Sequence, residues 1–127
     1  MSPELDRTLC NRYPAIFAER HAPATQSAMG WGFMLDDGWY ALLDLLCAAL
    51  QRETNLRAAP QVVATQVKEK FGSLHFRVHA ASDRQRVMIA LAERASTRIC
   101  EVCGKPGAWG HYPAIGPATR CVLHRSG

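Results

Sequence analysis

Apolar residues recur at helical spacing in three segments of the chain. The clearest segment is 39–52, where apolar side chains return every three or four residues: Trp39, Leu42, Leu43, Leu46, Cys47 and Leu50. This spacing predicts a helix with one wide apolar face, in which Cys47 is a small buried residue. An earlier helix is predicted to begin at Ser2-Pro3, a capping hydroxyl followed by proline, and to end by Pro14. A third is predicted from Asp83 to Ile99.

Residues 62–80 alternate between apolar and polar positions, which is the period of a half-buried strand. Gly72-Ser73 interrupts the alternation and predicts a two-residue turn between antiparallel strands at 62–71 and 74–80. The alternation assigns an inner face to Val63, Thr65, Val67, Phe71, Leu74, Phe76 and Val78, with Glu69 on that face against the pattern. The outer face is polar and mostly basic, and it carries Lys68, Lys70, His75, Arg77 and His79.

Helical and strand-like segments succeed one another without a repeat, which predicts an α+β fold in a single domain spanning residues 1–127. Its expected parts are a helical region with a long aromatic loop (1–60), a β-hairpin or small antiparallel sheet followed by the third helix (61–99), and a Gly/Pro-rich tail (100–127). Such a tail becomes compact only if something ties it together.

Two short pairs of potential metal ligands lie in that tail, Cys100 with Cys103 and Cys121 with His124. Paired ligands separated by two residues are typical of a tetrahedral zinc site, and four protein ligands make the site structural. We therefore expect one structural Zn²⁺ per chain, held in a C-terminal knuckle or ribbon. His111 is an alternative fourth ligand to His124, and the competing interpretation is that these cysteines are unrelated core thiols.

Charge is distributed unevenly along the chain. Residues 1–60 carry five Lys/Arg against seven Asp/Glu, whereas residues 61–127 carry ten against four. The excess in the second half favours an anionic partner, and the basic outer face of the hairpin could contact successive phosphates or acidic side chains. A solvated sheet face accounts for the same residues.

The loop before the central helix is rich in aromatic residues: Trp31, Phe33, Trp39 and Tyr40. Exposed aromatic side chains anchor protein interfaces, so this loop is a candidate partner-binding patch. The same residues could instead pack the loop onto the core.

Several functional classes lack their sequence signals. The chain has no apolar run long enough to span a membrane and no apolar segment near Met1 of the secretory type, so we expect a cytoplasmic protein without a membrane partner. It has no Gly-rich phosphate loop, no His-Glu-x-x-His and no Gly-x-Ser-x-Gly. These absences favour a non-catalytic protein.

Five strings along nearly the whole chain carry a resemblance: Leu9-Cys10-Asn11-Arg12-Tyr13-Pro14, Trp31-Gly32-Phe33, Gly38-Trp39-Tyr40, the segment 66–74 (QVKEKFGSL) and Cys100-Glu101-Val102-Cys103-Gly104. The chain resembles an uncharacterised family of small proteins encoded by bacteria, bacteriophages and prophages, with a central VKEKFG-type hairpin and a C-terminal CxxC…CxxH zinc motif. Members often carry Gly-Trp between the two pairs, where this chain has Trp109-Gly110. The resemblance implies a mobile-element setting and names no activity.

These observations lead us to expect a zinc-stabilised binding protein from a phage or mobile element. Its expected partner is a host or competitor protein, which it would bind as an anti-defence or immunity factor. The first alternative is a nucleic-acid-binding regulator that uses the basic hairpin face. The second is a remnant of an HNH nuclease, since Cys100–Gly104, His111 and the late Cys-x2-His resemble zinc-stapled HNH sites, although no later histidine follows His124. The oligomeric state stays open.

Overall fold

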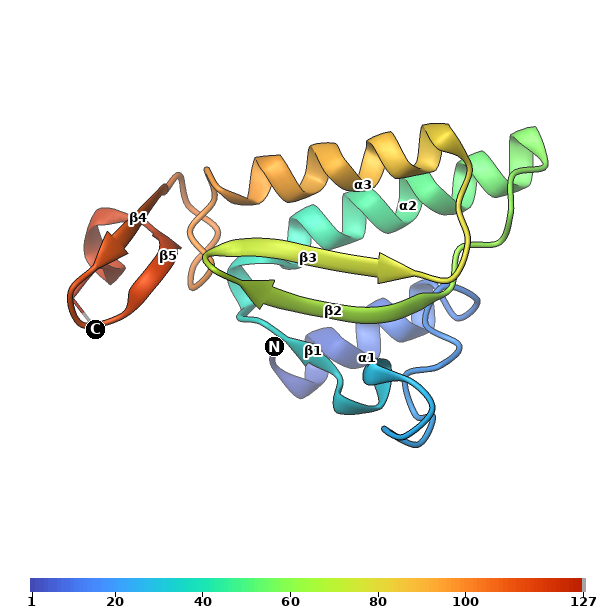
Figure 1. Cartoon of the computed structure of the whole chain (residues 1–127), viewed down its shortest axis with the longest axis horizontal. Helices are drawn as coiled ribbons and strands as arrows, with labels where there is room; N and C mark the ends of the chain where they lie inside the picture. Colours follow the sequence, from blue (N-terminus) through green and yellow to red (C-terminus); the bar gives the residue numbers. More distant parts are fainter. Residues whose placement is uncertain (127) are drawn as a thin grey trace.

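The fold is α+β, as the hydrophobic pattern predicted, and the computed structural model describes residues 1–126 (Figure 1). Its elements are α1 (Pro3–Arg12), η1 (Ala28–Trp31), β1 (Phe33–Met34), η2 (Asp37–Trp39), α2 (Tyr40–Arg57), β2 (Ala64–Lys70), β3 (Ser73–Val78), α3 (Asp83–Ser96), β4 (Ala108–Tyr112), β5 (Gly116–Arg120) and η3 (Val122–His124). The strands form a three-stranded sheet in the order β1-β2-β3 and a separate β4-β5 ribbon.

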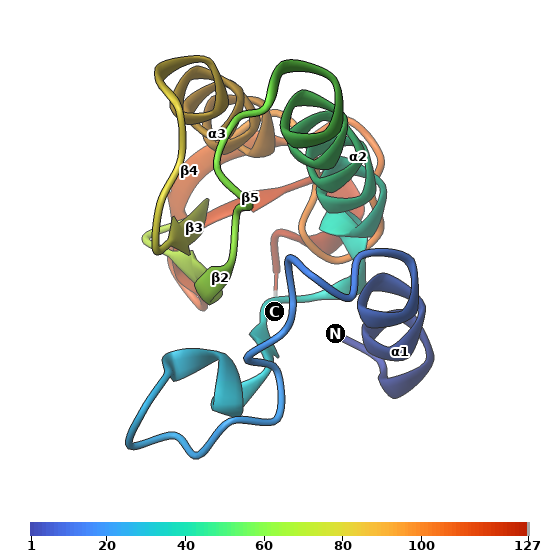
Figure 2. The same cartoon turned by 90° about the vertical axis from the view of Figure 1, so that its right-hand side faces the viewer.

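Helices α2 and α3 lie side by side on one face of the three-stranded sheet, while α1 lies next to α2 (Figure 2). The core fills the space between these layers with apolar side chains from α1, α2, α3 and the sheet. Its largest fully buried side chains include Trp39 and Phe76. The β4-β5 ribbon lies beyond the turn that joins β2 to β3, at one end of the molecule (Figure 1).

Helix boundaries follow local chemistry. Ser2 caps α1 by accepting a hydrogen bond from Leu5, and Ser82 caps α3 in a reciprocal capping box with Gln85. Helix α2 continues to Arg57, so the predicted end at residue 52 was wrong. The apolar stripe fades there, but Glu53 is buried and paired with Arg84 from α3, which holds the last turns in place.

The hairpin turn lies one residue earlier than predicted. Lys70 pairs with Ser73, so the loop residues are Phe71 and Gly72, both with positive φ (52° and 89°), as a type I′ turn requires. Phe71 is consequently 71% exposed instead of lying on the inner face. Glu69 accepts a hydrogen bond from the Gly72 amide, which explains an acid at an inward position.

A bulge between Ala64 and Gln66 shifts the alternation along β2. Val62 and Ala64 are therefore buried before it and Val67 after it, whereas Val63 and Thr65, predicted to face inward, are only half-buried. The two-residue strand β1 pairs in parallel with β2 and comes from the segment expected to be a loop. Because β1 is so short, alternation carried no signal for it.

Candidate metal centre and the surfaces around it

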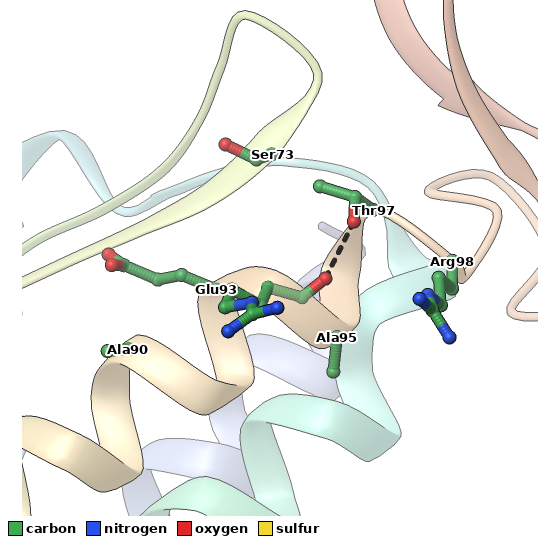
Figure 3. Close-up of a pocket in the computed structure, with 7 residues that line it drawn as sticks. Ser73, Ala90, Glu93, Ala95, Thr97 and Arg98 are labelled. Carbon is green, nitrogen blue, oxygen red and sulfur yellow. Dashed lines mark hydrogen bonds between the residues drawn. The ribbon is translucent and has the colours of Figure 1, made fainter.

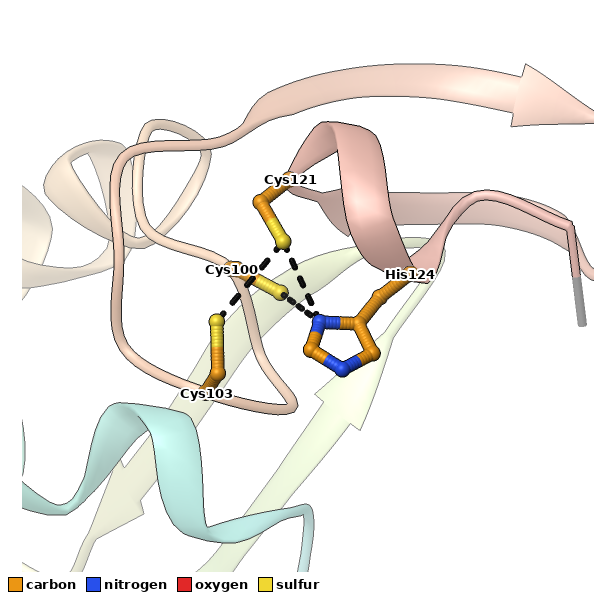
Figure 4. Close-up of side chains that lie close together, drawn as sticks. All are labelled: Cys100, Cys103, Cys121 and His124. Atoms are coloured by element: carbon orange, nitrogen blue, oxygen red, sulfur yellow. Dashed lines mark hydrogen bonds between the residues drawn. The ribbon is translucent and has the colours of Figure 1, made fainter.

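Four side chains from the C-terminal tail converge on one point: Cys100, Cys103, Cys121 and His124 (Figure 4). Their donor atoms all lie within 4.8 Å of one another. The Cys103 and Cys121 sulfurs are 3.7 Å apart, and His124 Nδ1 lies 3.7 Å from the Cys100 sulfur and 3.1 Å from the Cys121 sulfur. In a tetrahedral zinc site neighbouring ligand atoms are about 3.5 to 3.8 Å apart, as Zn–S bonds of about 2.3 Å require. The cluster can therefore hold a metal ion.

Two turns deliver these ligands. The first follows α3, where the Gly104 amide donates to the Cys100 carbonyl and Gly104 adopts a φ of 79° that favours glycine. The second follows β5, where the single turn η3 places His124 beside Cys121. The β4-β5 ribbon closes the distance between the two turns. Strand β5 ends at Arg120 and η3 begins at Val122, so Cys121 lies at the junction between them.

His111 does not belong to the cluster. It lies on β4, exposed and paired in register with Pro117, so the choice between the two histidines falls on His124. The imidazole of His124 turns Nδ1 toward the three sulfurs (Figure 4).

Cys100 differs chemically from Cys10 and Cys47, the two cysteines outside the cluster. Although burial acts in the opposite direction, backbone amides at Cys121, Cys103 and Val102 lower the pKa of the Cys100 thiol to about 6. Burial raises the pKa of Cys10 to about 11 and raises that of Cys47 still further. Since metals bind the thiolate, Cys100 is suited to ligation and the other two are suited to the protonated core state. Cys47 is fully buried in α2, as predicted.

Glu101, between the first two ligands, connects the metal turn to the rest of the fold. Its carboxylate accepts a hydrogen bond from the Asp36 amide (3.1 Å), and its carbonyl accepts one from Gly38 (2.7 Å). Its own amide donates to the Thr119 carbonyl (3.1 Å). Glu101 is only 6% exposed, and burial raises the pKa of its carboxyl group. Sequence reasoning missed this residue, and the only local signal was an acid between two cysteines.

Trp39 makes a second connection. Its indole nitrogen donates to the Ile99 carbonyl (2.8 Å), immediately before the first ligand, and its ring is fully buried. The neighbouring Gly38 lies so close to the turn that a Cβ atom would overlap the carbonyl oxygens of Cys100 and Glu101. The Gly-Trp pair therefore positions the metal turn.

The tip of the β2-β3 hairpin packs against the β4-β5 ribbon. The indole nitrogen of Trp109 donates to the Phe71 carbonyl (2.8 Å), and the Thr119 hydroxyl donates to the Gly72 carbonyl (2.7 Å). A side chain on Gly72 would overlap Trp109, so the turn needs glycine both for its φ and for this approach. The ribbon is thus held both by the hairpin turn and by the contacts of Glu101 and Trp39 at the first ligand turn.

Two of the four aromatic residues proposed as a partner-binding patch are core residues, which corrects that interpretation. Trp39 is fully buried, and Phe33 is 6% exposed and packs edge-on against Phe17. Tyr40 is half-buried beside the core, and only Trp31 is largely exposed. The loop is held down by its aromatic side chains, so it does not form a continuous apolar surface.

The basic residues of the hairpin share one face of the sheet. Lys68 lies directly opposite His75, and the Arg77 side chain donates to His75 Nε2 (2.9 Å). Burial and then the charges of Arg77, Lys70 and Lys68 lower the pKa of His75. His79 is engaged by Glu19 at 2.6 Å. Of the five predicted residues, Lys68, Lys70 and Arg77 therefore supply the positive charge, His75 lies among them as a hydrogen-bond acceptor, and His79 is bonded to an acid.

A hollow of about 740 Å³ lies between the hairpin and the end of α3 (Figure 3). It is lined by Ser73, Ala90, Glu93, Arg94, Ala95, Thr97 and Arg98. The carboxylate of Glu93 accepts a hydrogen bond from the Phe76 amide (2.9 Å), and Thr97 donates to the Arg94 carbonyl. Glu93 therefore satisfies a backbone donor on the free edge of β3.

Within residues 1–126, no helix combines the length and apolar composition that a membrane crossing requires. Comparison with known proteins finds no family model that matches the chain, and no curated protein or solved structure that is similar to it.

Proposed function

We propose that the chain is a non-catalytic protein-binding module whose C-terminal ribbon is held by one structural Zn²⁺. Three thiolates and one imidazole are a soft donor set that suits zinc, and four protein donors leave no open position for water or substrate. Because Glu101 and Trp39 tie the first ligand turn to the core, the metal supports the shape of the molecule. An HNH-like catalytic role would need a metal with an open position.

The observation that carries the binding role is an apolar groove between α2 and α3. Its walls are almost wholly apolar, it has a volume of about 320 Å³, and it is lined by Leu42, Leu45, Leu46, Ala49, Met88, Leu91, Ala92 and Ala95. Leu45 is 71% exposed and Leu91 is 59% exposed. Exposed apolar side chains gathered in one groove are typical of protein interaction sites. This groove takes the place of the aromatic loop as the candidate protein-binding surface.

The setting we propose is a phage or other mobile element, and the partner is a host or competitor protein, as for an anti-defence or immunity factor. This part of the proposal is supported by the family resemblance of the sequence and by the small, closed architecture. The test is tagged capture of the zinc-loaded chain from candidate host cells, with and without nuclease treatment. We expect one protein to be recovered in stoichiometric amount with the chain, and its binding to persist after nuclease treatment. Loss of every captured protein on nuclease treatment would contradict the proposal.

A second candidate function is nucleic-acid binding through the positive surface that Lys68, Lys70 and Arg77 form around His75. These side chains share a sheet face, as successive phosphate contacts would require. Binding of DNA or RNA that weakens steeply with salt and is lost in the double variant Lys68→Glu, Arg77→Glu would favour this function over the first. Salt-insensitive or absent binding would leave the protein partner as the sole role.

A further inference from the structure

The α2/α3 groove has the geometry of a binding site for a helix from another protein. Helices α2 and α3 run antiparallel: Arg84 at the start of α3 pairs with Glu53 late in α2, whereas Trp39 just before α2 bonds to Ile99 just after α3 (Figure 1). One row of groove residues runs along each helix, Leu42, Leu45 and Ala49 on α2 and Met88, Leu91 and Ala95 on α3, with Leu46 and Ala92 beside them. On each helix these positions follow one another at alternating three- and four-residue spacing, the seam that packs along another helix.

Arginines lie at both ends of the groove. Continuing the same spacing along each helix reaches Arg52 on α2 and Arg84 on α3 at one end, and Arg98 after α3 at the other. Arg94 and Arg98 also line the hollow described above, together with the groove residue Ala95. Figure 3 labels Arg98 and Ala95 there. All four arginines are exposed.

Three acids on α2 and α3 are already engaged, and Asp83 at the start of α3 stays exposed to solvent. Glu53 is buried and holds Arg84 at 2.8 Å and Arg57 at 3.5 Å. Asp44 bonds to Arg12 and Tyr13, and Glu93 accepts from the Phe76 amide in the sheet. Because Arg84 is paired with Glu53, the groove presents an apolar floor with Arg52 supplying the remaining positive charge at one end and Arg94 and Arg98 supplying it at the other.

We infer that this groove binds an amphipathic helix of the partner protein, apolar along one stripe and acidic at both flanks; the inference rests on the proposed protein-binding function. The seam from Leu42 to Arg52 is about 15 Å long at 1.5 Å per residue, which matches about three turns of a bound helix. Leucine and methionine side chains receive the apolar stripe, and the arginines pair with Asp or Glu at its ends.

A second copy of this chain fits the groove less well. In a two-fold dimer each copy would bring its own arginine-bordered groove, so basic ends would meet basic ends at a low-dielectric contact. The charge pattern instead calls for a partner of opposite sign. Nucleic acid supplies that sign but has no apolar stripe for the groove floor.

The test uses the full zinc-loaded chain and a yeast-displayed library of helical peptides of about 16 residues, long enough to cover the groove at 1.5 Å per residue. Selection for binding is expected to enrich peptides with apolar residues at i, i+3, i+4 and i+7 and with Asp or Glu at both ends. The variants Leu45→Glu and Leu91→Glu, both at exposed positions, should weaken the selected peptides about tenfold or more. Thr8→Glu, at an exposed position on α1 away from the groove and with the same added charge, should leave binding unchanged.

A charge exchange makes the test sharper. In the double variant Arg52→Glu, Arg98→Glu, the enriched flanks should change from acidic to basic. Absence of enrichment, flanks without an acidic bias, or binding that survives Leu91→Glu would overturn the inference. A concentration-dependent dimer that Leu91→Glu disrupts, with no peptide enriched, would assign the groove to a second copy. A cellular partner that still binds Leu45→Glu and Leu91→Glu would preserve the proposed function and reject the groove.

Discussion

The hydroxyl of Thr119 in β5 donates a 2.7 Å hydrogen bond to the carbonyl of Gly72, in the turn between β2 and β3. Both groups are buried, and 47 residues of chain separate them. This bond is one of the contacts that join the ligand-bearing ribbon to the central sheet. The ribbon has others through Trp109 and Glu101, which makes the contribution of each connection measurable.

Replacing Thr119 with valine tests that connection. Thr119→Val keeps the side-chain shape and leaves the buried Gly72 carbonyl unpaired, which should lower the free energy of unfolding by about 1–3 kcal/mol. Urea denaturation of the metal-loaded protein measures the change. The matched control is Thr97→Val, which removes a hydroxyl that bonds only to Arg94 within its own turn, and it should cost much less. Equal losses of unfolding free energy in the two variants would show that the Thr119 bond contributes no more to stability than the local Thr97 bond.

Substitution of Gly38 probes the contact between the α2 entry and the metal turn. In Gly38→Ala the new methyl group would overlap the carbonyls of Cys100 and Glu101, so the backbone must separate at a cost of about 1–3 kcal/mol or more. Thermal unfolding and metal affinity should both fall. Gly116→Ala is the control: its φ of 87° costs roughly 1–2 kcal/mol, but no atom lies near the added Cβ, so metal affinity should stay unchanged. Unaltered metal affinity in Gly38→Ala would contradict this account.

The metal ligands could be predicted from sequence because their signal is local. Two ligands separated by two residues can chelate one ion regardless of how distant parts of the chain fold. The spacing around Cys100 and Cys121 was therefore sufficient to predict a metal site. The choice of His124 over His111 was open, because it depends on how the β4-β5 ribbon folds back. Periodicity likewise located α1, α2, α3 and the hairpin, since each buries one regular face.

What the sequence did not predict depends on contacts between distant segments. Phe71 carries a positive φ that local propensity disfavours, and the turn is supported there by Trp109 and Thr119 from the ribbon. Trp39 was read as a possible surface anchor because nothing local shows that its indole meets the Ile99 carbonyl, 60 residues away. Glu101 was overlooked for the same reason.

Substitution of the two candidate histidines of the tail, His124 and His111, gives a direct test of the ligand set. His124→Asn removes the Nδ1 that faces the three sulfurs, and should weaken zinc retention and loosen the ribbon because metal binding and folding are coupled. His111→Asn, at an exposed position on β4, should retain one zinc per chain. Native mass spectrometry and a chromogenic chelator competition measure both. Full retention in His124→Asn together with loss in His111→Asn would transfer the fourth ligand to His111.

Tyr13 predicts an alkaline transition. Burial, followed by its hydrogen bond to Asp44, raises the pKa of Tyr13 to about 12, above the usual value of about 10. Because the folded pKa is raised, the stabilisation is fully present below pH 10 and is lost as pH rises toward 12. Absorbance titration at the phenolate band should show one of the three tyrosines ionising late. Tyr13→Phe should remove that late step, whereas Tyr112→Phe should retain it; a late step that persists in Tyr13→Phe would assign it to another residue.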